Sequence, residues 1–304
     1  MKNLRILLIT IIVIVSWNPP VSAETIDTSR EYKETIGRHI QFYLSNDIHL
    51  GMHDALEAFR SGHFSSSDHS VINFGIGSKP VWLALQVRNS GHGSAHRNLL
   101  FETAWLDKID IYFLQGDQLI NSYHVGDSLL FSKRPLNHRF FVAGHLFEQG
   151  ETTVLIQVES PDPMVLPIYF MNTENITDRN ALQGYSYGFL YGVILALIAY
   201  NFMLYIGLRS SHHLFYSIYL LSFLITNAAY TGHGYQWLWP ESPQWQSWSN
   251  PVLMLTYSVS GLVFAIHFLN IKRSFPRIYR MVIGSCMIFG ALLLLAILTA
   301  SHEA

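Results

Sequence analysis

Hydrophobic and polar residues alternate along the front half of the chain. The clearest run is 81–89, VWLALQVRN, in which every second residue from Val81 to Val87 is aliphatic. Strict alternation of this length is typical of a β-strand with one buried face. Similar short runs, separated by Gly, Asn, Asp and Pro turns, occur at 99–103, 109–113, 118–123, 139–142, 154–159 and 165–171. About eight such strands, preceded by a short helix near 51–60, predict an all-β sandwich, and we expect a jelly roll.

The back half contains long apolar runs instead. Four of them follow one another, at 181–208, 212–232, 250–269 and 279–300. A helix needs about 20 residues to cross the hydrocarbon core of a membrane, and buried helices of soluble proteins rarely repeat that length four times. The pattern therefore predicts an α-helical bundle with four transmembrane spans over 181–300. None of the spans contains Asp or Glu, which disfavours a pump or transporter.

The N-terminus has the pattern of an export signal. Two basic residues precede the apolar run 6–15, and Val21 and Ala23 occupy the −3 and −1 positions of a cleavage site. This predicts a signal peptide over 1–23, with an uncleaved anchor helix as the alternative. Export would make 24–175 a periplasmic β-sandwich sensor domain.

Charge divides the chain near the same place. Residues 24–179 contain 12 Lys and Arg against 19 Asp and Glu, whereas only two acids follow residue 180. An acidic half in water and an acid-poor half in lipid explain this division. The overall charge of −2 argues against nucleic-acid binding, which needs a basic face.

The loops between the apolar runs set the orientation. Basic residues gather in 209–213 and 270–280, and the loop 234–250 between them has none. Basic loops stay in the cytoplasm, so we expect a multi-pass protein of a bacterial inner membrane with its N-terminal domain in the periplasm. The predicted cytoplasmic positive loop carries Lys272, Arg273, Arg277 and Arg280. The predicted membrane-interface anchors are Trp237, Trp239, Trp245 and Trp248.

Several motifs follow one another in a recognisable order. They are PVWLALQVRNS, LDKIDIYFLQGDQLI, the Gly126-Asp127 step, Arg134-Pro135 with His138-Arg139-Phe140, LIQVESPDPMVLPIYF, Tyr191-Gly192 through Ala199-Tyr200-Asn201, and GHGYQWLWP. In this order they resemble the bacterial seven-transmembrane receptors with diverse intracellular signalling modules (7TMR-DISM), carrying the type 2 extracellular domain. The resemblance covers nearly all of 24–304.

The resemblance implies a ligand-sensing ectodomain with a carbohydrate-binding-like sandwich fold. Through a helical bundle it would control a cytoplasmic output, commonly a diguanylate cyclase, a histidine kinase or a phosphatase. The chain departs from the family in having four predicted spans instead of seven. We therefore expect either truncation within the membrane domain or a short relative that signals through a partner. Ala84 stands where the family often has a basic residue.

Catalytic motifs are missing from the sequence. It has no nucleophile elbow, phosphate-binding glycine loop or paired carboxylates in a recognisable frame, so we expect no catalytic residue, no cofactor and no enzymatic activity within this chain. The pairs His49/His53 and His92/His96 have helical metal-ligand spacing, but no Cys or nearby carboxylate completes a site, and no metal is expected.

Ligand binding is the chemistry that the front half favours. The polar face of the strand 81–89 carries Trp82, Gln86 and Arg88, and the family order would bring Arg134 and Arg139 near. An aromatic ring beside Arg and Gln suits a sugar or a carboxylate. The alternative is that Trp82 fills an apolar layer and the arginines pair with acids.

The sequence thus favours a sensory receptor module that responds to a small periplasmic ligand, which could be carbohydrate-like. A short linker at 173–184 would transmit the change to the first helix. Expected partners are membrane lipid, that ligand and a cytoplasmic effector domain or partner protein, and a homodimer is kept open. Two alternatives remain: the input half of a diguanylate cyclase or histidine kinase whose catalytic domain is absent, and an envelope glycan-binding anchor.

Overall fold

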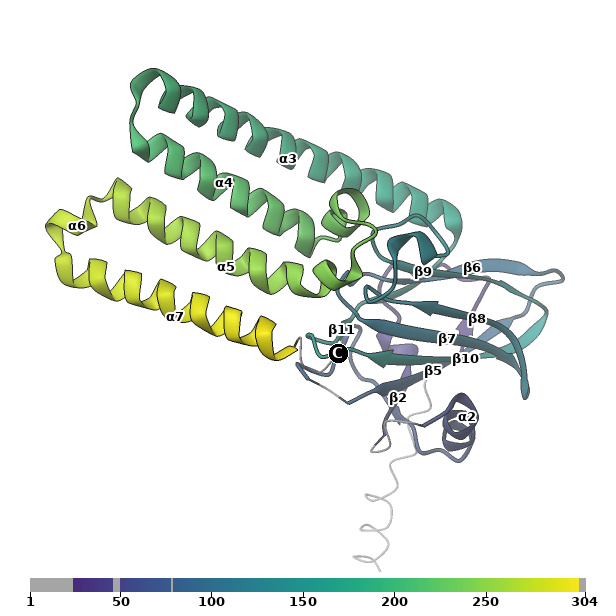
Figure 1. Cartoon of the computed structure of the whole chain (residues 1–304). Coiled ribbons are helices and arrows are strands. Elements are labelled where there is room, and N and C mark those ends of the chain that lie inside the picture. Colours follow the sequence, from purple (N-terminus) through teal and green to yellow (C-terminus); the bar gives the residue numbers. More distant parts are fainter. Residues whose placement is uncertain (1–23, 46–49, 78, 301–304) are drawn as a thin grey trace, which may run out of the picture. The chain divides into compact units, whose positions relative to one another are not determined.

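The computed structural model describes residues 24–45, 50–77 and 79–300 (Figure 1). The predicted signal peptide, 1–23, lies outside the described residues. Contacts between residues divide the chain into two compact units. The sheet unit contains the chain up to Arg97 with Asp110–Tyr123 and Gly144–Phe170. The helix unit contains Asn98–Ile109, His124–Ala143 and the chain from Met171 onward.

The largest sheet has seven strands. They are β1 (Ile26–Asp27), β2 (Gln41–Leu44), β3 (Ser65–Ser66), β5 (Val81–Asn89), β7 (Lys108–Gln115), β8 (Gln118–Val125) and β10 (Gly150–Glu159). Their order is β3-β2-β5-β10-β7-β8, and β1 pairs in parallel with β5. β5 and β10 are antiparallel from the pair Asn89 and Gly150 to the pair Val81 and Val158. The long alternating run 81–89 therefore forms a central strand, as its pattern predicts.

A smaller sheet packs against this one. Its strands β6 (Ala95–Phe101), β9 (Phe141–Phe147) and β12 (Ile168–Met171) have the order β12-β6-β9, and β4 (Ile72–Asn73) pairs separately with β11 (Val165–Leu166). Phe147 of β9 contacts Phe113 of β7 at 6.0 Å and Phe170 of β12 at 5.7 Å between ring centroids. The core thus lies between two sheets. The strand-rich front half is confirmed, and its jelly-roll topology stays a prediction.

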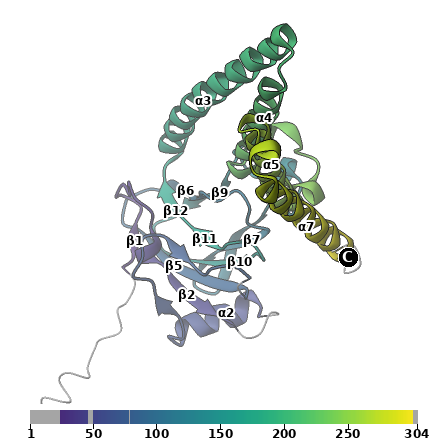
Figure 2. The same ribbon diagram turned by 90° about the vertical axis from the view of Figure 1, so that its left-hand side faces the viewer.

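The helix α2 (Met52–Arg60) explains why β5 is buried on both faces. The aliphatic residues from Val81 to Val87 face one core, but Trp82 and Ala84 on the opposite face are also buried. Leu56 of α2 packs in one cluster with them, and α2 lies against this face of the sheet (Figure 2). The short helix predicted near 51–60 therefore covers the face that the alternation left open.

Among the described residues, the helix unit contains four long helices and three short helical segments. They are the 3-10 turn η2 (Phe131–Lys133), α3 (Thr173–Leu208), α4 (Ser211–Tyr230), the π-helical turn η3 (Gly234–Leu238), α5 (Pro243–Phe268), α6 (Ile271–Ser274) and α7 (Pro276–Ala300). α4 packs between α3 and α5, and α5 also contacts α7 (Figure 1).

Three of the four predicted membrane spans are confirmed, and the span predicted over α4 is not. Among the described residues three helices, within α3, α5 and α7, are long and apolar enough to cross a membrane. α4 carries His212, His213 and Asn227 as well as several hydroxyl groups, which lower its mean hydropathy. Because α4 has protein on two sides, it needs less apolar surface than a lipid-facing helix.

The predicted linker at 173–184 is also corrected. β12 ends at Met171, and α3 begins at Thr173 with the Asn172 side chain accepting a hydrogen bond from the backbone nitrogen of Asn175 at 2.7 Å. Asx side chains favour this position because they satisfy a free amide at the helix start. The segment is therefore the first turns of a 36-residue helix, about 54 Å long.

Candidate functional site

Three of the predicted ligand-binding residues lie in the sheet unit, where they do not form a cluster. Trp82 is 1% exposed and stacks on Tyr112 at 6.1 Å. Gln86 is exposed on the same strand, and Arg88 is paired with Glu151 across β5 and β10 at 2.5 Å. The alternative that Trp82 fills an apolar layer is therefore the one observed, and the predicted aromatic platform is covered.

Arg134 and Arg139 belong to the helix unit, where they are at the centre of a polar contact region that we call the junction. The junction comprises 98–109, 124–143, the α3 residues 173–191, the α4–α5 connection 231–242 and Gln246. All these segments belong to the same compact unit. The junction is the strongest candidate for a functional site because it joins strand connections to α3, the end of α4 and α5 through buried polar groups.

Arg139 links two helices of the junction. It is 3% exposed, and its Nη1 donates to the carbonyl oxygen of Thr231 at 3.0 Å, beyond the end of α4. Its Nη2 donates to Oε1 of Gln183 on α3 at 2.8 Å. Gln183 donates in turn to Glu102 at 2.8 Å, and Arg179 pairs with the same carboxylate at 2.6 Å. The two arginines thus share one acid through a chain of hydrogen bonds, which we call the Arg139 network.

A second cluster surrounds His233. Its Nδ1 lies 3.1 Å from the Tyr191 hydroxyl and 2.9 Å from the Thr231 hydroxyl, and Trp237 stacks on its ring at 4.4 Å. Burial, with the nearby charge of Arg139, lowers the pKa of His233 to about 4. His233 is therefore neutral at ordinary pH and acts as a hydrogen-bonding partner in the core of the junction.

Arg134 occupies an aromatic cage. Its guanidinium lies over the rings of Phe131 at 4.6 Å, Phe141 at 4.4 Å and Tyr235 at 5.4 Å. Its Nη1 donates to the carbonyl oxygens of His138 and Arg139 at 3.1 and 2.8 Å. Burial lowers the pKa of Arg134 to about 10, against the attraction of Asp127. The residue thus stays charged at neutral pH and fixes the backbone that positions Arg139.

The α4–α5 connection is held to 124–143 by further contacts. Tyr235 donates from its hydroxyl to the carbonyl oxygen of Leu129 at 2.5 Å, and burial raises the pKa of this hydroxyl to about 12. Gln246, 1% exposed, accepts from the Trp239 indole nitrogen at 2.8 Å and donates to buried Asp127 at 3.4 Å. The connection is therefore docked by several contacts to the strand connections.

Two glycines make this docking possible. Gly232 has φ +81°, and an added Cβ would lie 2.9 Å from the carbonyl oxygen of Arg139. At Gly126 an added Cβ would lie 1.9 Å from the carbonyl oxygen of Asp107. Only a residue without a side chain allows the backbones to approach this closely.

The predicted membrane-interface tryptophans differ in their surroundings. Trp237 is 60% exposed and Trp245 38% exposed, whereas Trp239 and Trp248 are half-buried. Exposure suits an interfacial ring for the first two, and this role stays a prediction for all four. Three of the predicted positive-loop residues, Lys272, Arg273 and Arg277, are exposed around α6 and the start of α7, with Arg280 exposed in the next turn.

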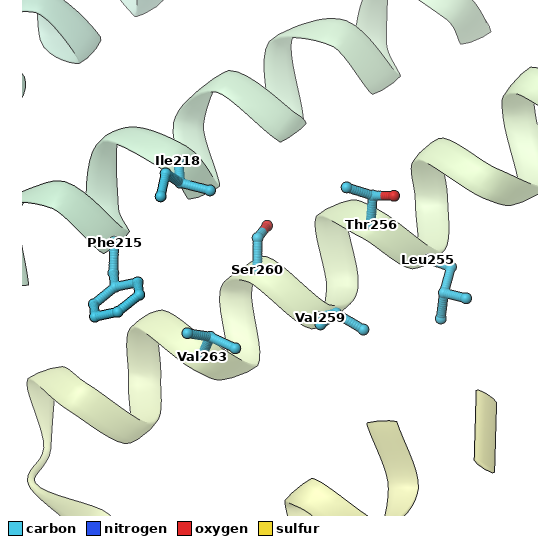
Figure 3. Close-up of a pocket in the computed structure, with 7 residues that line it drawn as sticks. All are labelled: Phe215, Ile218, Leu255, Thr256, Val259, Ser260 and Val263. Atoms are coloured by element: carbon cyan, nitrogen blue, oxygen red, sulfur yellow. The ribbon is translucent and has the colours of Figure 1, made fainter. Parts of the chain in front are cut away.

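An apolar groove lies elsewhere in the helix unit. It measures about 370 Å³ and is lined by α4 and α5 side chains, including Phe215, Ile218 and Val263 (Figure 3). Its two hydroxyl groups, on Thr256 and Ser260, already donate to the carbonyl oxygens of their own helix. The groove therefore offers hydrocarbon surface without a free polar group, and it does not suit a polar ligand.

Comparison with known families divides the chain into two consecutive stretches, whereas the two compact units interleave along the sequence. Residues 37–172 match the model of the 7TMR-DISM extracellular 2 domain, and residues 183–304 match the model described as 7TM diverse intracellular signalling. The chain belongs to the 7TMR-DISM family. A search of curated proteins found no significant match. The interval between the two matches, 173–182, lies in the first turns of α3, which are part of the junction.

Sequence reasoning found Arg134 and Arg139 but missed their surroundings. Glu102, Gln183, His233 and Gln246 have no periodic or compositional signal that would bring them together. The motif GHGYQWLWP did carry information, because its glycines and its Tyr235 are the groups that dock the connection. A loop expected only at the membrane surface thus forms part of the buried junction.

Proposed function

We propose that the chain is the receiving part of a bacterial inner-membrane receptor, in which a small periplasmic ligand changes the β-rich domain and the junction passes the change to the membrane helices. The family establishes a membrane receptor signalling module with an extracellular sensor domain. The single observation that carries the proposal is the Arg139 network, because it connects the strand connections to both α3 and the end of α4.

The start of α3 supports a stiff connection. No flexible segment separates Met171 of β12 from Thr173, and Asn98 of β6 donates to Met171 and Thr173 at 3.4 and 3.2 Å. A helix transmits rotation or tilt over its whole length, whereas a flexible linker would absorb it. A movement of β6 or β12 would therefore reach α3 directly.

The junction also supports a topology in which α4 crosses the membrane. The connection 231–242 contacts 124–143, which belongs to the extracellular domain, so both must lie on the same side. If α3 crosses to the cytoplasm, α4 must return the chain. Its lower hydropathy is compatible with crossing because α3 and α5 cover it.

The structure removes one of the ligand-binding features that the sequence suggested. Besides the family resemblance, the residue argument for a carbohydrate-like ligand relied on Trp82 as a stacking platform, and Trp82 is buried beneath α2. We therefore propose a small ligand without that platform. The output would come from a cytoplasmic effector domain or partner protein, in keeping with the family's intracellular signalling, and this chain would not itself be an enzyme.

The coupling can be tested by electron-spin distance measurement on the full chain in lipid nanodiscs. Spin labels at Ser210 and Ser274, with Cys286→Ser, report the two connections on the cytoplasmic side. A Gly-Ser-Gly-Ser insertion between Asn172 and Thr173, or Arg139→Ala, should broaden or shift the distance distribution. The same insertion between Gly116 and Asp117, in an exposed hairpin, should leave it unchanged. An unchanged distribution in both junction variants would refute the coupling.

A further inference from the structure

A cavity of about 430 Å³ lies on the sheet unit, outside the junction, and none of the predicted ligand-binding residues lines it. It is lined mainly by consecutive side chains of the segment that precedes β2, between Glu31 and His39. Small-molecule sites in proteins have about 300–1,000 Å³. The volume therefore suits a small ligand.

The backbone beneath this cavity is fixed from two sides. Ile36 donates from its backbone nitrogen to the carbonyl oxygen of Ile168 in β12 at 2.8 Å, and Gly37 donates to the carbonyl oxygen of Ser70 at 3.1 Å. An added Cβ at Gly37 would lie 2.4 Å from that oxygen, so this close approach needs glycine. The floor of the cavity is thus a rigid part of the fold.

Its aromatic wall is fixed as well. The Tyr32 ring makes edge contacts with Phe170 at 6.2 Å and with His39 at 5.4 Å. The Tyr32 hydroxyl accepts a hydrogen bond from the backbone nitrogen of Asp27 at 3.0 Å. Because both ends of Tyr32 are held, the ring presents a preformed apolar surface to the cavity.

Four charged side chains complete the lining, and they are of both signs. Glu31, Lys33, Glu34 and Arg38 are exposed, and none makes a hydrogen bond or ion pair with another residue in the part of the chain that the structure describes. The adjacent Arg30, by contrast, pairs with Glu24 at 3.7 Å. Two cations and two anions around one cavity are thus free to meet a ligand.

From this arrangement we infer that the cavity binds a small zwitterion, a free amino acid or a short peptide. The carboxylate would meet Arg38 and Lys33, and the ammonium group would meet Glu31 and Glu34. Charge-assisted hydrogen bonds of this kind are the strongest that a polar site offers. A purely anionic ligand would be repelled by the two glutamates, and a purely cationic one by Arg38 and Lys33.

The inference that the zwitterion is the signal sensed by the module rests on the receptor function proposed above. The inference that the cavity binds a zwitterion does not rest on it. β12, which anchors Ile36, leads through Met171 into α3, so occupation of the cavity has a covalent route to the first helix. Binding and its transmission can therefore be measured separately.

Binding is tested by titration calorimetry of the full chain in nanodiscs. The probes are a panel of L-amino acids and the dipeptide Ala-Ala. N-acetylated Ala-Ala, which lacks the ammonium group, and Ala-Ala amide, which lacks the carboxylate, are the matched controls. We expect a member of the panel to bind, and each analogue of the dipeptide to bind at least about tenfold more weakly than Ala-Ala itself.

The variants Arg38→Ala and Glu34→Gln should each weaken binding at least about tenfold, and Arg30→Ala should not. All three change exposed side chains, and unchanged thermal unfolding would verify their fold. The inference is overturned if no zwitterion binds at about 10 mM, if the single-charge analogues bind equally well, or if both lining variants bind like the unmodified chain. If a zwitterion binds but the distance between the labels at Ser210 and Ser274 does not change, the binding site is supported and the proposed receptor function is contradicted.

Discussion

Arg139 donates a hydrogen bond from Nη1 to the backbone carbonyl oxygen of Thr231 at 3.0 Å. Thr231 caps the C-terminal end of α4, where the last carbonyl groups have no partner within the helix. A buried cation at this end satisfies a free acceptor and opposes the negative end of the helix dipole. The contact joins residues 92 positions apart and fixes the α4–α5 connection to the strand connections.

The first prediction concerns this contact. Arg139→Ala removes both bonds of the guanidinium and leaves two partly buried acceptors, the Thr231 carbonyl oxygen and the Gln183 Oε1, without this partner. We expect the free energy of unfolding to fall by about 3 kcal/mol. Arg139→Lys should recover only part of the loss, because an ammonium group cannot reach both acceptors in the geometry of a planar fork. Denaturant unfolding in detergent micelles measures the difference.

The control for Arg139 is an arginine with an exposed partner. Arg88 and Glu151 form an ion pair in which each side chain is 55% exposed. Arg88→Ala should therefore change the free energy of unfolding by less than about 1 kcal/mol. Equal effects of Arg88→Ala and Arg139→Ala would show that the Arg139 network adds nothing beyond a surface contact.

The second prediction concerns the close approach at Gly232. Gly232→Ala introduces a Cβ 2.9 Å from the Arg139 carbonyl oxygen and 3.0 Å from the Ala104 Cβ, at a φ of +81°. Gly116, with φ +60°, has nothing within 4 Å of an added Cβ. Gly116→Ala should thus cost about 1 kcal/mol through backbone strain alone, and Gly232→Ala about 1–3 kcal/mol more through steric overlap. Similar melting temperatures for Gly232→Ala and Gly116→Ala would contradict the close approach of the backbones at Gly232.

The strands were predictable because their signal is local. The run 81–89 has the same bounds as β5, because aliphatic residues for one buried face recur at every second position from Val81 to Val87. The role of Trp82 was not predictable in the same way, because the helix that covers it lies 22 to 30 positions earlier and packs on the face that alternation marks as polar. Tertiary contact of α2, which no local pattern encodes, decided the burial of that side chain.

The junction was partly predictable. The positions of Arg134 and Arg139 followed from the family motif, but their role did not, because a buried arginine and a ligand-binding arginine look alike in a sequence. The segment 173–184 was predicted to be a linker because the first long apolar run begins only at 181, and Thr173 to Arg179 carry three charges. Instead these charges lie on the first turns of α3, where Arg179 pairs with Glu102 at 2.6 Å. The long-range partner of Arg179 could not be identified from the sequence.

The third prediction separates packing from ligand binding at Trp82. Trp82→Ala leaves a cavity beneath α2, and the free energy of unfolding should fall by about 4 kcal/mol. Gln86→Ala, on the exposed end of the same strand face, should have almost no effect. Trp82→Phe keeps most of the volume and should recover most of the stability. If Trp82→Ala unfolded at the temperature of the unmodified chain, the ring would not be part of the core.

The fourth prediction follows from His138 and His233, which burial holds at pKa values of about 4. An unfolded chain would titrate its histidines near 6.5, so between pH 6.5 and pH 4 the unfolded state binds more protons than the folded state. The contribution of the two neutral histidines to the free energy of unfolding is therefore fully present above pH 6.5 and is lost as the pH drops towards 4. Melting temperatures over this range should decline less steeply in the double variant His138→Asn, His233→Gln.

The matched histidine for the pH experiment is His63, which is exposed after α2. His63→Gln should leave the pH profile of the melting temperature unchanged. If the junction variants also left it unchanged, protonation of these two histidines would not contribute to acid destabilisation, and the decline would have to come from carboxylates elsewhere.

The last prediction tests whether α4 crosses the membrane. An alkaline phosphatase fused after Ser242, in the α4–α5 connection, should be active, because this enzyme folds only outside the cytoplasm. A fusion after Ser274, between α5 and α7, should be inactive. If α4 lay on the membrane surface without crossing, both results would be inverted. The Arg139–Thr231 contact requires the first outcome, since Arg139 belongs to the extracellular domain and the bond is 3.0 Å long. Inverted activities would mean that this contact does not exist in the membrane, and the coupling route through the junction would be lost with it.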